Sequence, residues 1–256
     1  MPTPTQLLTR LDELGRALAS TERALGLIGL GSVGLERGRL DNYSDLDFFV
    51  IARPGHKQFF LDDLSWFNAP CPLVFAFLNT ADGYKALFAD GIFCEMAVFE
   101  PDELANIPFA AGQIIWQADD APADMGSPRV PLPRSSHTAE WHLNEALTNL
   151  YVGLGRYWRG EKLTAMRFIQ VYALDRVLAL AATLEPAQQA FPDPFSPDRR
   201  CEQRLPQASQ LLPVFAQGYE QTPASAVAIL NYLEQHFEVN PHLGRAIRQL
   251  AQPPLS

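Results

Sequence analysis

The sequence has few cysteines, no long apolar run and no excess of basic residues. Its cysteines, Cys71, Cys94 and Cys201, lie too far apart for a disulfide framework or a Cys-x-x-Cys metal knuckle. It has no apolar stretch of about 18 residues, which excludes a membrane-spanning helix. The first residues show no basic region followed by an apolar one, so we expect no secretory signal and a cytoplasmic protein.

The charge is acidic and uneven. The chain has 20 Lys and Arg against 29 Asp and Glu, a formal net charge of −9, which argues against bulk binding to a nucleic-acid backbone. Residues 1–134 hold 18 acidic and 10 basic side chains, and residues 135–256 hold 11 and 10. The net charge of residues 1–134 is therefore −8, nearly all of the total of −9. These acids either form an ordinary solvated surface or belong to a site that binds cations.

Apolar residues are plentiful, at 47% of the 256 residues, which is typical of a globular chain with a substantial core. In residues 1–134, leucines at helical spacing predict a helix over 4–25, with Thr5 as its N-cap, and a second helix is predicted over 57–67. Apolar runs predict strands over 25–30, 45–52, 73–78, 84–88 and 92–99. The Asp90-Gly91 turn signal predicts that the last two strands form a hairpin.

The pattern changes after a proline-rich segment, residues 119–133, which we interpret as a linker between domains. Beyond it, only helical spacing is found, with helices predicted over 136–159, 163–184, 207–219, 224–237 and 242–252. The sequence therefore predicts an α+β protein. A mixed-sheet domain over 1–134 is followed by an all-α helical bundle over 135–256.

A glycine-rich stretch, GLGSVG at residues 29–34, follows the first predicted strand. It matches the GxGxxG fingerprint of dinucleotide-binding proteins, so an NAD-binding protein is one hypothesis. That fingerprint needs an amphipathic helix directly after the glycines. The following residues, LERGRLDNYS, are mostly polar and reach the next strand too soon for such a helix.

A second interpretation uses two acids at the start of the next strand. Residues i and i+2 of a strand point to the same face, so Asp45 and Asp47 present two carboxylates side by side. Such a pair repels unless a cation neutralises it, which indicates a hard divalent metal ion such as Mg²⁺. Gly31-Ser32 could approach the phosphates of a nucleotide closely, because glycine has no side chain.

A third carboxylate belongs to Glu95, the one acid inside the apolar strand predicted over 92–99. An unpaired buried acid is unfavourable by several kcal/mol, so Glu95 should face a cation or a site. If Glu95 instead faces solvent at a sheet edge, Glu100 is the substitute. Arg37 and Arg39 could be ordinary loop charges, and Ser44 could simply turn the chain.

These residues resemble the nucleotidyltransferase superfamily with its GS…DxD…(D/E) signature. The matching positions are Gly31-Ser32, Ser44-Asp45-Leu46-Asp47 and Glu95 within FCEM. Among its members the chain looks most like the lincosamide and aminoglycoside antibiotic nucleotidyltransferases. Arg37-Gly38 and the stretch over residues 149–161 are similar to the lincosamide branch.

The resemblance implies an adenylyltransferase-like enzyme. Asp45, Asp47 and Glu95 would form the metal site, with Mg²⁺ on Asp45 and Asp47, while Gly31, Ser32, Arg37 and Ser44 contact the phosphates of ATP or another nucleoside triphosphate. Glu95 would accept the proton of a hydroxyl on a small-molecule acceptor, such as an antibiotic. The expected partners are thus this acceptor and the nucleotide. We expect no bulk binding to nucleic acid and no membrane association, and a homodimer is possible.

A competing hypothesis is a non-catalytic nucleotide-binding or regulatory module. A further version is a nucleotidyltransferase that modifies proteins, of the toxin–antitoxin type. The retained set of three carboxylates favours catalysis, because clustered acids are unfavourable where no reaction requires them.

Overall fold

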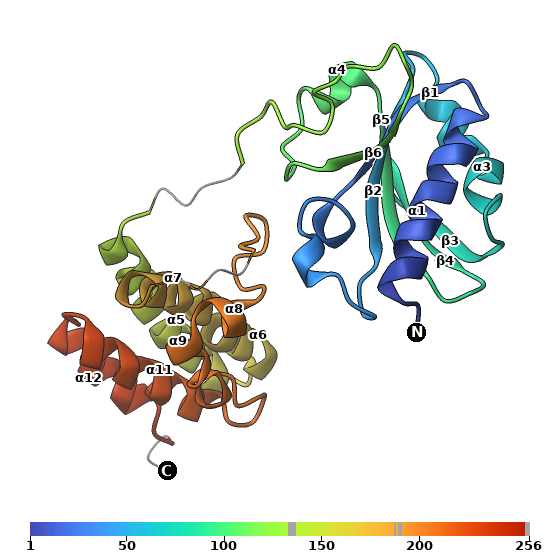
Figure 1. The fold of residues 1–256 in the computed structure, drawn as a ribbon. Coiled ribbons are helices and arrows are strands. Elements are labelled where there is room, and N and C mark those ends of the chain that lie inside the picture. The colour runs from blue at the N-terminus through green and yellow to red at the C-terminus, as the bar shows by residue number, and fades with distance from the viewer. Residues whose placement is uncertain (133–136, 187, 189–190, 254–256) are drawn as a thin grey trace. The chain divides into compact units, whose positions relative to one another are not determined.

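The computed structural model describes residues 1–132, 137–186, 188 and 191–253. The chain divides into two compact units, Met1–Pro133 and Arg134–Ser256 (Figure 1). Among the described residues, no helix combines the length and the apolar character needed to cross a bilayer.

The first unit is built on a six-stranded sheet with the strand order β3-β4-β5-β2-β1-β6. Only β2 and β5 pair in parallel, and the other four neighbouring pairs are antiparallel. A mixed sheet in this unit was predicted and is confirmed. The strands are β1 (Ala24–Gly29), β2 (Leu46–Ala52), β3 (Leu73–Thr80), β4 (Gly83–Phe88), β5 (Phe93–Phe99) and β6 (Gln113–Gln117).

One face of the sheet is covered by helices. The longest is α1 (Pro4–Ala19), with α2 (Lys57–Asp62) and α3 (Ser65–Asn68) beside it. Four of the leucines of α1 are fully buried against the sheet, Leu7, Leu11, Leu14 and Leu18. Thr3, rather than the predicted Thr5, caps α1, because its hydroxyl accepts the Gln6 amide in a capping box. The helix ends at Ala19 and not at residue 25, since the chain turns there into β1.

The other face is covered at one end only. There, residues of β2 and β5 pack against the segment that follows β5, which includes α4 (Pro101–Leu104). The Phe49 ring makes edge contacts with Phe99 and Phe109 at 5.0 and 5.6 Å between centroids. Met125 is buried in the same cluster, and the Gly112 amide donates to the Gly126 carbonyl at 2.8 Å. Much of the predicted linker over 119–133 is therefore packed onto the sheet.

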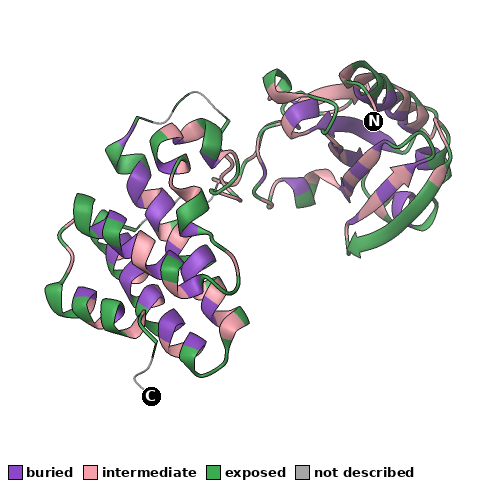
Figure 2. Ribbon diagram, turned by 90° about the horizontal axis from the view of Figure 1, so that it is seen from below, coloured by how far each residue is buried: buried purple, intermediate pink, exposed green. Residues whose placement is uncertain are grey.

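Strand β3 forms one edge of the sheet and is exposed along nearly its whole length, so it is drawn mostly green in Figure 2. Four of its large apolar side chains, Val74, Phe75, Phe77 and Leu78, are between 46% and 61% exposed. An uncharged, apolar edge strand offers unpaired backbone groups and apolar surface together.

The described residues of the second unit form helices and loops and no strand. Helix α5 lies at its centre and contacts α6 and α7, which follow it in sequence, as well as α11 and α12. A helical bundle was predicted here and is confirmed. The helices are α5 (Ala139–Trp158), α6 (Lys162–Arg167), α7 (Leu174–Leu184), α8 (Cys201–Arg204), α9 (Pro206–Ser209), α10 (Leu212–Phe215), α11 (Thr222–His236) and α12 (Pro241–Leu250), with a π-helical segment, Phe168–Ala173, joining α6 to α7.

Two predicted helices are interrupted. The helix predicted over 57–67 breaks at Asp63, whose carboxylate accepts the Ser65 amide and starts α3. The one predicted over 207–219 is replaced by the short helices α9 and α10, because Pro206 and Pro213 each lie in a first helical turn. The predicted helix start at residue 136 lies outside the described residues.

Candidate functional site

The turn after β1 brings a backbone bend next to an arginine and an aspartate. Gly31 has φ +49°, the left-handed region that glycine adopts readily. The position that a Cβ of Gly31 would occupy lies 2.5 Å from Arg39 Nη2 and 4.0 Å from Asp47 Oδ2. Arg39 and Asp47 therefore flank Gly31, and the missing side chain makes room for the guanidinium.

Asp47 and Glu95 are neighbours across the parallel strand pair. They are register partners on β2 and β5, and adjacent strands lie about 4.8 Å apart. Both side chains are half-buried, at the uncovered end of the sheet face that Phe49 and Ala97 share. They line one pocket of ≈ 260 Å³, to which Asn79 and Thr80 of β3 also contribute.

Asp45, which was predicted to open the strand, lies directly before the first residue of β2. It does not line the pocket of Asp47 and Glu95. The charges of Asp45 and Asp47 act on the buried thiol of Cys94, the residue before Glu95. Burial is the main cause that raises the pKa of Cys94 well above its usual range. The charge of Arg10 is the next largest effect and lowers this pKa, and the charges of Asp45, Asp47 and Asp90 each raise it by less.

Lys85 extends this row of charges onto β4. It is the register partner of Glu95, and its Nζ lies 2.5 Å from Glu95 Oε1. The prediction that Glu95 faces a cation is thus met by a lysine of the same hairpin. Lys85 was missed in the sequence, although the predicted turn at Asp90-Gly91 places residues 85 and 95 opposite each other.

The two arginines of the loop over residues 30–45 lie in different surroundings. Arg37 is exposed, whereas Arg39 is half-buried, pairs with Glu36 and reaches Gly31. Ser32 is only 3% exposed, in the 3-10 turn Gly31–Val33. We find that Arg39, rather than Arg37, is the positive charge next to the Gly31 turn.

Two other residues singled out in the sequence, Ser44 and Glu100, stabilise local backbone structure through hydrogen bonds. The Ser44 hydroxyl donates to Asp41 Oδ1 at 3.0 Å and accepts the Asp41 amide at 3.1 Å, so it closes the loop before β2. Glu100, the substitute for Glu95, accepts the Gly55 and Lys57 amides and caps α4. Glu95 is therefore the acid that accompanies Asp47.

The donor set is suited to a hard cation, although it is not a complete metal site. Among the described residues, no group of three or more carboxylate, histidine or cysteine side chains is arranged to hold a metal ion. Mg²⁺ in nucleotide enzymes needs only one or two protein carboxylates, because phosphate oxygens and water supply the other ligands. The metal role of Asp45 and Asp47 stays a prediction.

The dinucleotide-binding interpretation is wrong. Strands β1 and β2, on either side of the glycine-rich stretch, pair antiparallel, whereas the fingerprint belongs to a parallel strand–helix–strand unit. Between them the chain forms only the short 3-10 turns Gly31–Val33 and Arg37–Arg39. Gly34 is needed instead for a close approach, since a Cβ there would lie 2.3 Å from the Gly29 carbonyl oxygen.

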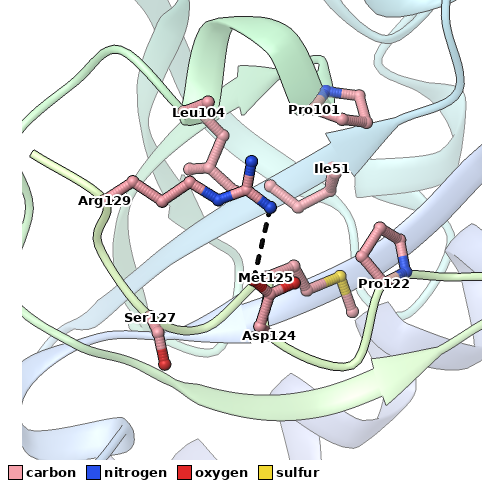
Figure 3. Close-up of a pocket in the computed structure, with 9 residues that line it drawn as sticks. Ile51, Pro101, Leu104, Pro122, Asp124, Met125, Ser127 and Arg129 are labelled. Carbon is pink, nitrogen blue, oxygen red and sulfur yellow. Dashed lines mark hydrogen bonds and ion pairs between the residues drawn. The ribbon is translucent and has the colours of Figure 1, made fainter.

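A second hollow of the first unit lies against the segment that covers the sheet. Figure 3 shows Arg129 reaching across it to Asp124, between Leu104 and Met125, with Nη2 and Oδ2 3.2 Å apart. Its free volume is ≈ 30 Å³, about that of a single water molecule. We therefore place the candidate site at Asp47 and Glu95.

Comparison with known proteins gives only structural matches. No family model and no curated protein matches the chain. Among solved structures, the chain is similar to an aminoglycoside 6-adenyltransferase from Bacillus subtilis, at 12% identity and a TM-score of 0.34, over 98% of this chain and 92% of that one. It is also similar to a nucleotidyltransferase-like protein from Exiguobacterium sibiricum 255-15, at 14% identity and a TM-score of 0.33, over 88% and 74% of the two chains.

Proposed function

We propose that this chain is a Mg²⁺-dependent nucleotidyltransferase, which moves a nucleoside monophosphate, most readily AMP from ATP, to a hydroxyl of a small-molecule acceptor. The observation that carries the proposal is the pairing of Asp47 with Glu95 in one pocket, next to the Gly31 turn. A site for the phosphates, a metal-binding carboxylate and a base are what this reaction requires.

The residues divide into two roles in this proposal. The Gly31 turn, with Ser32, Ser44 and the guanidinium of Arg39, faces the nucleotide phosphates, and Arg37 adds positive charge from the loop surface. Asp45 and Asp47 would hold Mg²⁺, which would offset the negative charge of the phosphates when bound. Because Gly31 has no side chain, the guanidinium of Arg39 can occupy the space beside the turn, where it would contact a phosphate.

Glu95 is the proposed base. It accepts the proton of the acceptor hydroxyl while that oxygen forms a bond to the α-phosphorus of the nucleotide. The bond between the α-phosphorus and the bridging oxygen breaks, and pyrophosphate leaves with the electron pair. Lys85 orients Glu95 through their ion pair across the hairpin.

Pyrophosphate release tests the proposal. The chain is incubated with Mg-ATP and a panel of small hydroxyl compounds that includes an aminoglycoside and a lincosamide. Pyrophosphate should appear with a cognate acceptor and require Mg²⁺. Asp47→Asn and Glu95→Gln should each lower the rate by at least about a hundredfold. Asp12→Asn, which removes one exposed carboxylate on α1, is the matched control.

Calorimetry with Mg-ATP separates the enzyme from a non-catalytic module. An enzyme binds Mg-ATP, and Asp47→Asn weakens the binding while Asp12→Asn does not. Binding that survives Asp47→Asn with unchanged dependence on Mg²⁺ would contradict the metal role. Turnover with a protein acceptor in place of every small hydroxyl compound would favour the protein-modifying alternative.

A further inference from the structure

The second unit contains a pocket of its own. It has a volume of ≈ 370 Å³, within the range of about 300–1,000 Å³ that is usual for small-molecule sites. Its walls come from α5, α7 and the chain that leads into α8. Apolar side chains of α7 and the start of α9 form one side of it, from Leu178, Ala179, Ala182 and Leu205.

Two exposed carboxylates, Asp175 and Asp198, line this pocket without an ion pair to any described residue. Asp175 and Asp198 make no hydrogen bond or ion pair through their side chains with the described residues. They lie close enough to repel each other. Burial, together with the charge of Asp198, raises the pKa of Asp175 above its ordinary value, in spite of the neighbouring Arg176.

The basic groups of the pocket do not neutralise these acids. Arg204 donates to the carbonyls of Pro197 and Arg199, so its guanidinium is used to hold the loop. Arg176 lies over the ring of Trp141, with Cζ 5.2 Å from the ring centroid. His142 is 7% exposed, and burial, with Arg176 and His137, lowers its pKa, so it is uncharged at neutral pH.

The loop that carries Asp198 is fixed in place. Asp193 accepts the amides of Phe195 and Ser196 at 2.9 and 3.2 Å and pairs with Arg199 at 2.8 Å. Arg204 binds the same loop from α8. These hydrogen bonds and the ion pair thus hold Asp198 at the pocket. Because the loop is already ordered, the entropic cost of binding a ligand is lower.

We propose that this pocket binds a small organic cation, a primary ammonium group attached to an apolar body. The ammonium group lies between Asp175 and Asp198, where it relieves their repulsion and donates charge-assisted hydrogen bonds. The apolar body contacts Leu178, Ala182 and Leu205. The proposal uses only residues of the second unit, and it stands independently of the nucleotidyl transfer proposed for the first.

Isothermal titration calorimetry with the full chain tests it. The probes are benzylamine and hexylamine, with benzyl alcohol and hexanol as uncharged counterparts and benzoate and hexanoate as anionic ones. The amines should bind at least about tenfold more tightly than the alcohols, and the carboxylates should not bind. Failure of both amines to bind in the millimolar range would overturn the proposal, as would equal binding of amine and alcohol.

Variants then locate the binding. Asp175→Asn and Asp198→Asn should each weaken amine binding about tenfold. Glu238→Gln, which removes an equal charge from an exposed position away from the pocket, should leave it unchanged. Ala182→Phe, at an exposed position of α7 that tolerates a larger side chain, should fill the pocket and abolish binding. Amine binding that persists in Ala182→Phe, or that falls equally in Glu238→Gln, would place the cation elsewhere and contradict the assignment.

Discussion

Lys85 and Glu95 face each other across the β4–β5 hairpin, with Nζ and Oε1 2.5 Å apart. Glu95 is at the same time the register partner of Asp47 on the parallel strand β2. One lysine and two acids therefore form a row across three adjacent strands. The lysine offsets part of the repulsion between the acids and orients one of them.

Removal of this lysine should affect turnover more than nucleotide binding. Lys85→Met leaves Glu95 without its ion pair, so we expect kcat for pyrophosphate release to fall about tenfold or more with little change in KM for ATP. Lys85→Arg keeps the positive charge and should recover much of the rate. Steady-state kinetics checks both variants, and equal losses in Lys85→Met and Lys85→Arg would contradict a charge-based positioning role.

The left-handed turn at Gly31 predicts a difference between two glycine variants. Gly31→Ala and Gly55→Ala both place a side chain at positive φ, so each should lower the free energy of unfolding by about 1–2 kcal/mol. Only at Gly31 would the new methyl group meet Arg39, because nothing lies within 4 Å of the corresponding position at Gly55. Chemical denaturation measures the first effect. Calorimetry with Mg-ATP should show weaker binding in Gly31→Ala alone.

Thiol labelling should distinguish the cysteines. Burial and the nearby carboxylates raise the pKa of Cys94 well above its usual range, and burial, with a hydrogen bond to Glu202, raises the pKa of Cys201 to about 11. Because the thiolate is the reactive form, iodoacetamide at mildly alkaline pH should label the partly exposed Cys71 first. Mass spectrometry of the intact chain gives the number of labels attached. A Cys71→Ser variant that is still labelled rapidly without denaturant would refute this order.

Mild acid should destabilise the second unit through His142. Burial is the main cause of its lowered pKa, so the unfolded chain binds this proton at a higher pH than the folded chain does. The unfolded state therefore holds more protons just below the ordinary histidine pKa of about 6.5. The stabilisation by neutral His142 is complete above that pH and is lost as the pH falls.

Thermal unfolding at a series of pH values between about 5 and 8 measures this loss. His142→Gln should show a flatter dependence of Tm on pH than the parent chain, and His56→Gln, a change at a histidine of the first unit, should not. An identical slope in His142→Gln and the parent would show that other groups govern the acid sensitivity.

Local patterns predicted most of the fold. The strands of the first unit, except β6, are apolar runs bounded by turn residues, and the long helices of the second unit repeat at helical spacing. Strand β6 was missed because its five residues, QIIWQ, are short and only half-buried and lie beside a proline-rich segment. That same segment looked like a linker, because its packing against the sheet depends on one buried side chain, Met125, and on backbone bonds that composition does not reveal.

The candidate site was partly predictable. The spacing of Asp45 and Asp47 and the lone acid in an apolar strand singled out the acids, and the parallel register then places Asp47 next to Glu95. The positive charges required more than spacing. Arg39 reaches Gly31 only because the loop folds into two 3-10 turns, which its polar sequence does not specify. Lys85 could have been found by following the predicted hairpin residue by residue.

The parallel pairing of β2 with β5 also determines when the acid pair can form during folding. Asp47 and Glu95 are 48 residues apart in sequence (95 minus 47), whereas Lys85 and Glu95 are joined by a short hairpin. A hairpin closes in about 1–10 μs, but a contact over a long loop must first overcome the entropy of closing it. We therefore expect Glu95 to meet its lysine first during synthesis. The two acids come together only after the whole β3–β5 meander has emerged and docked on β2, so the lysine is already in place when the like charges meet.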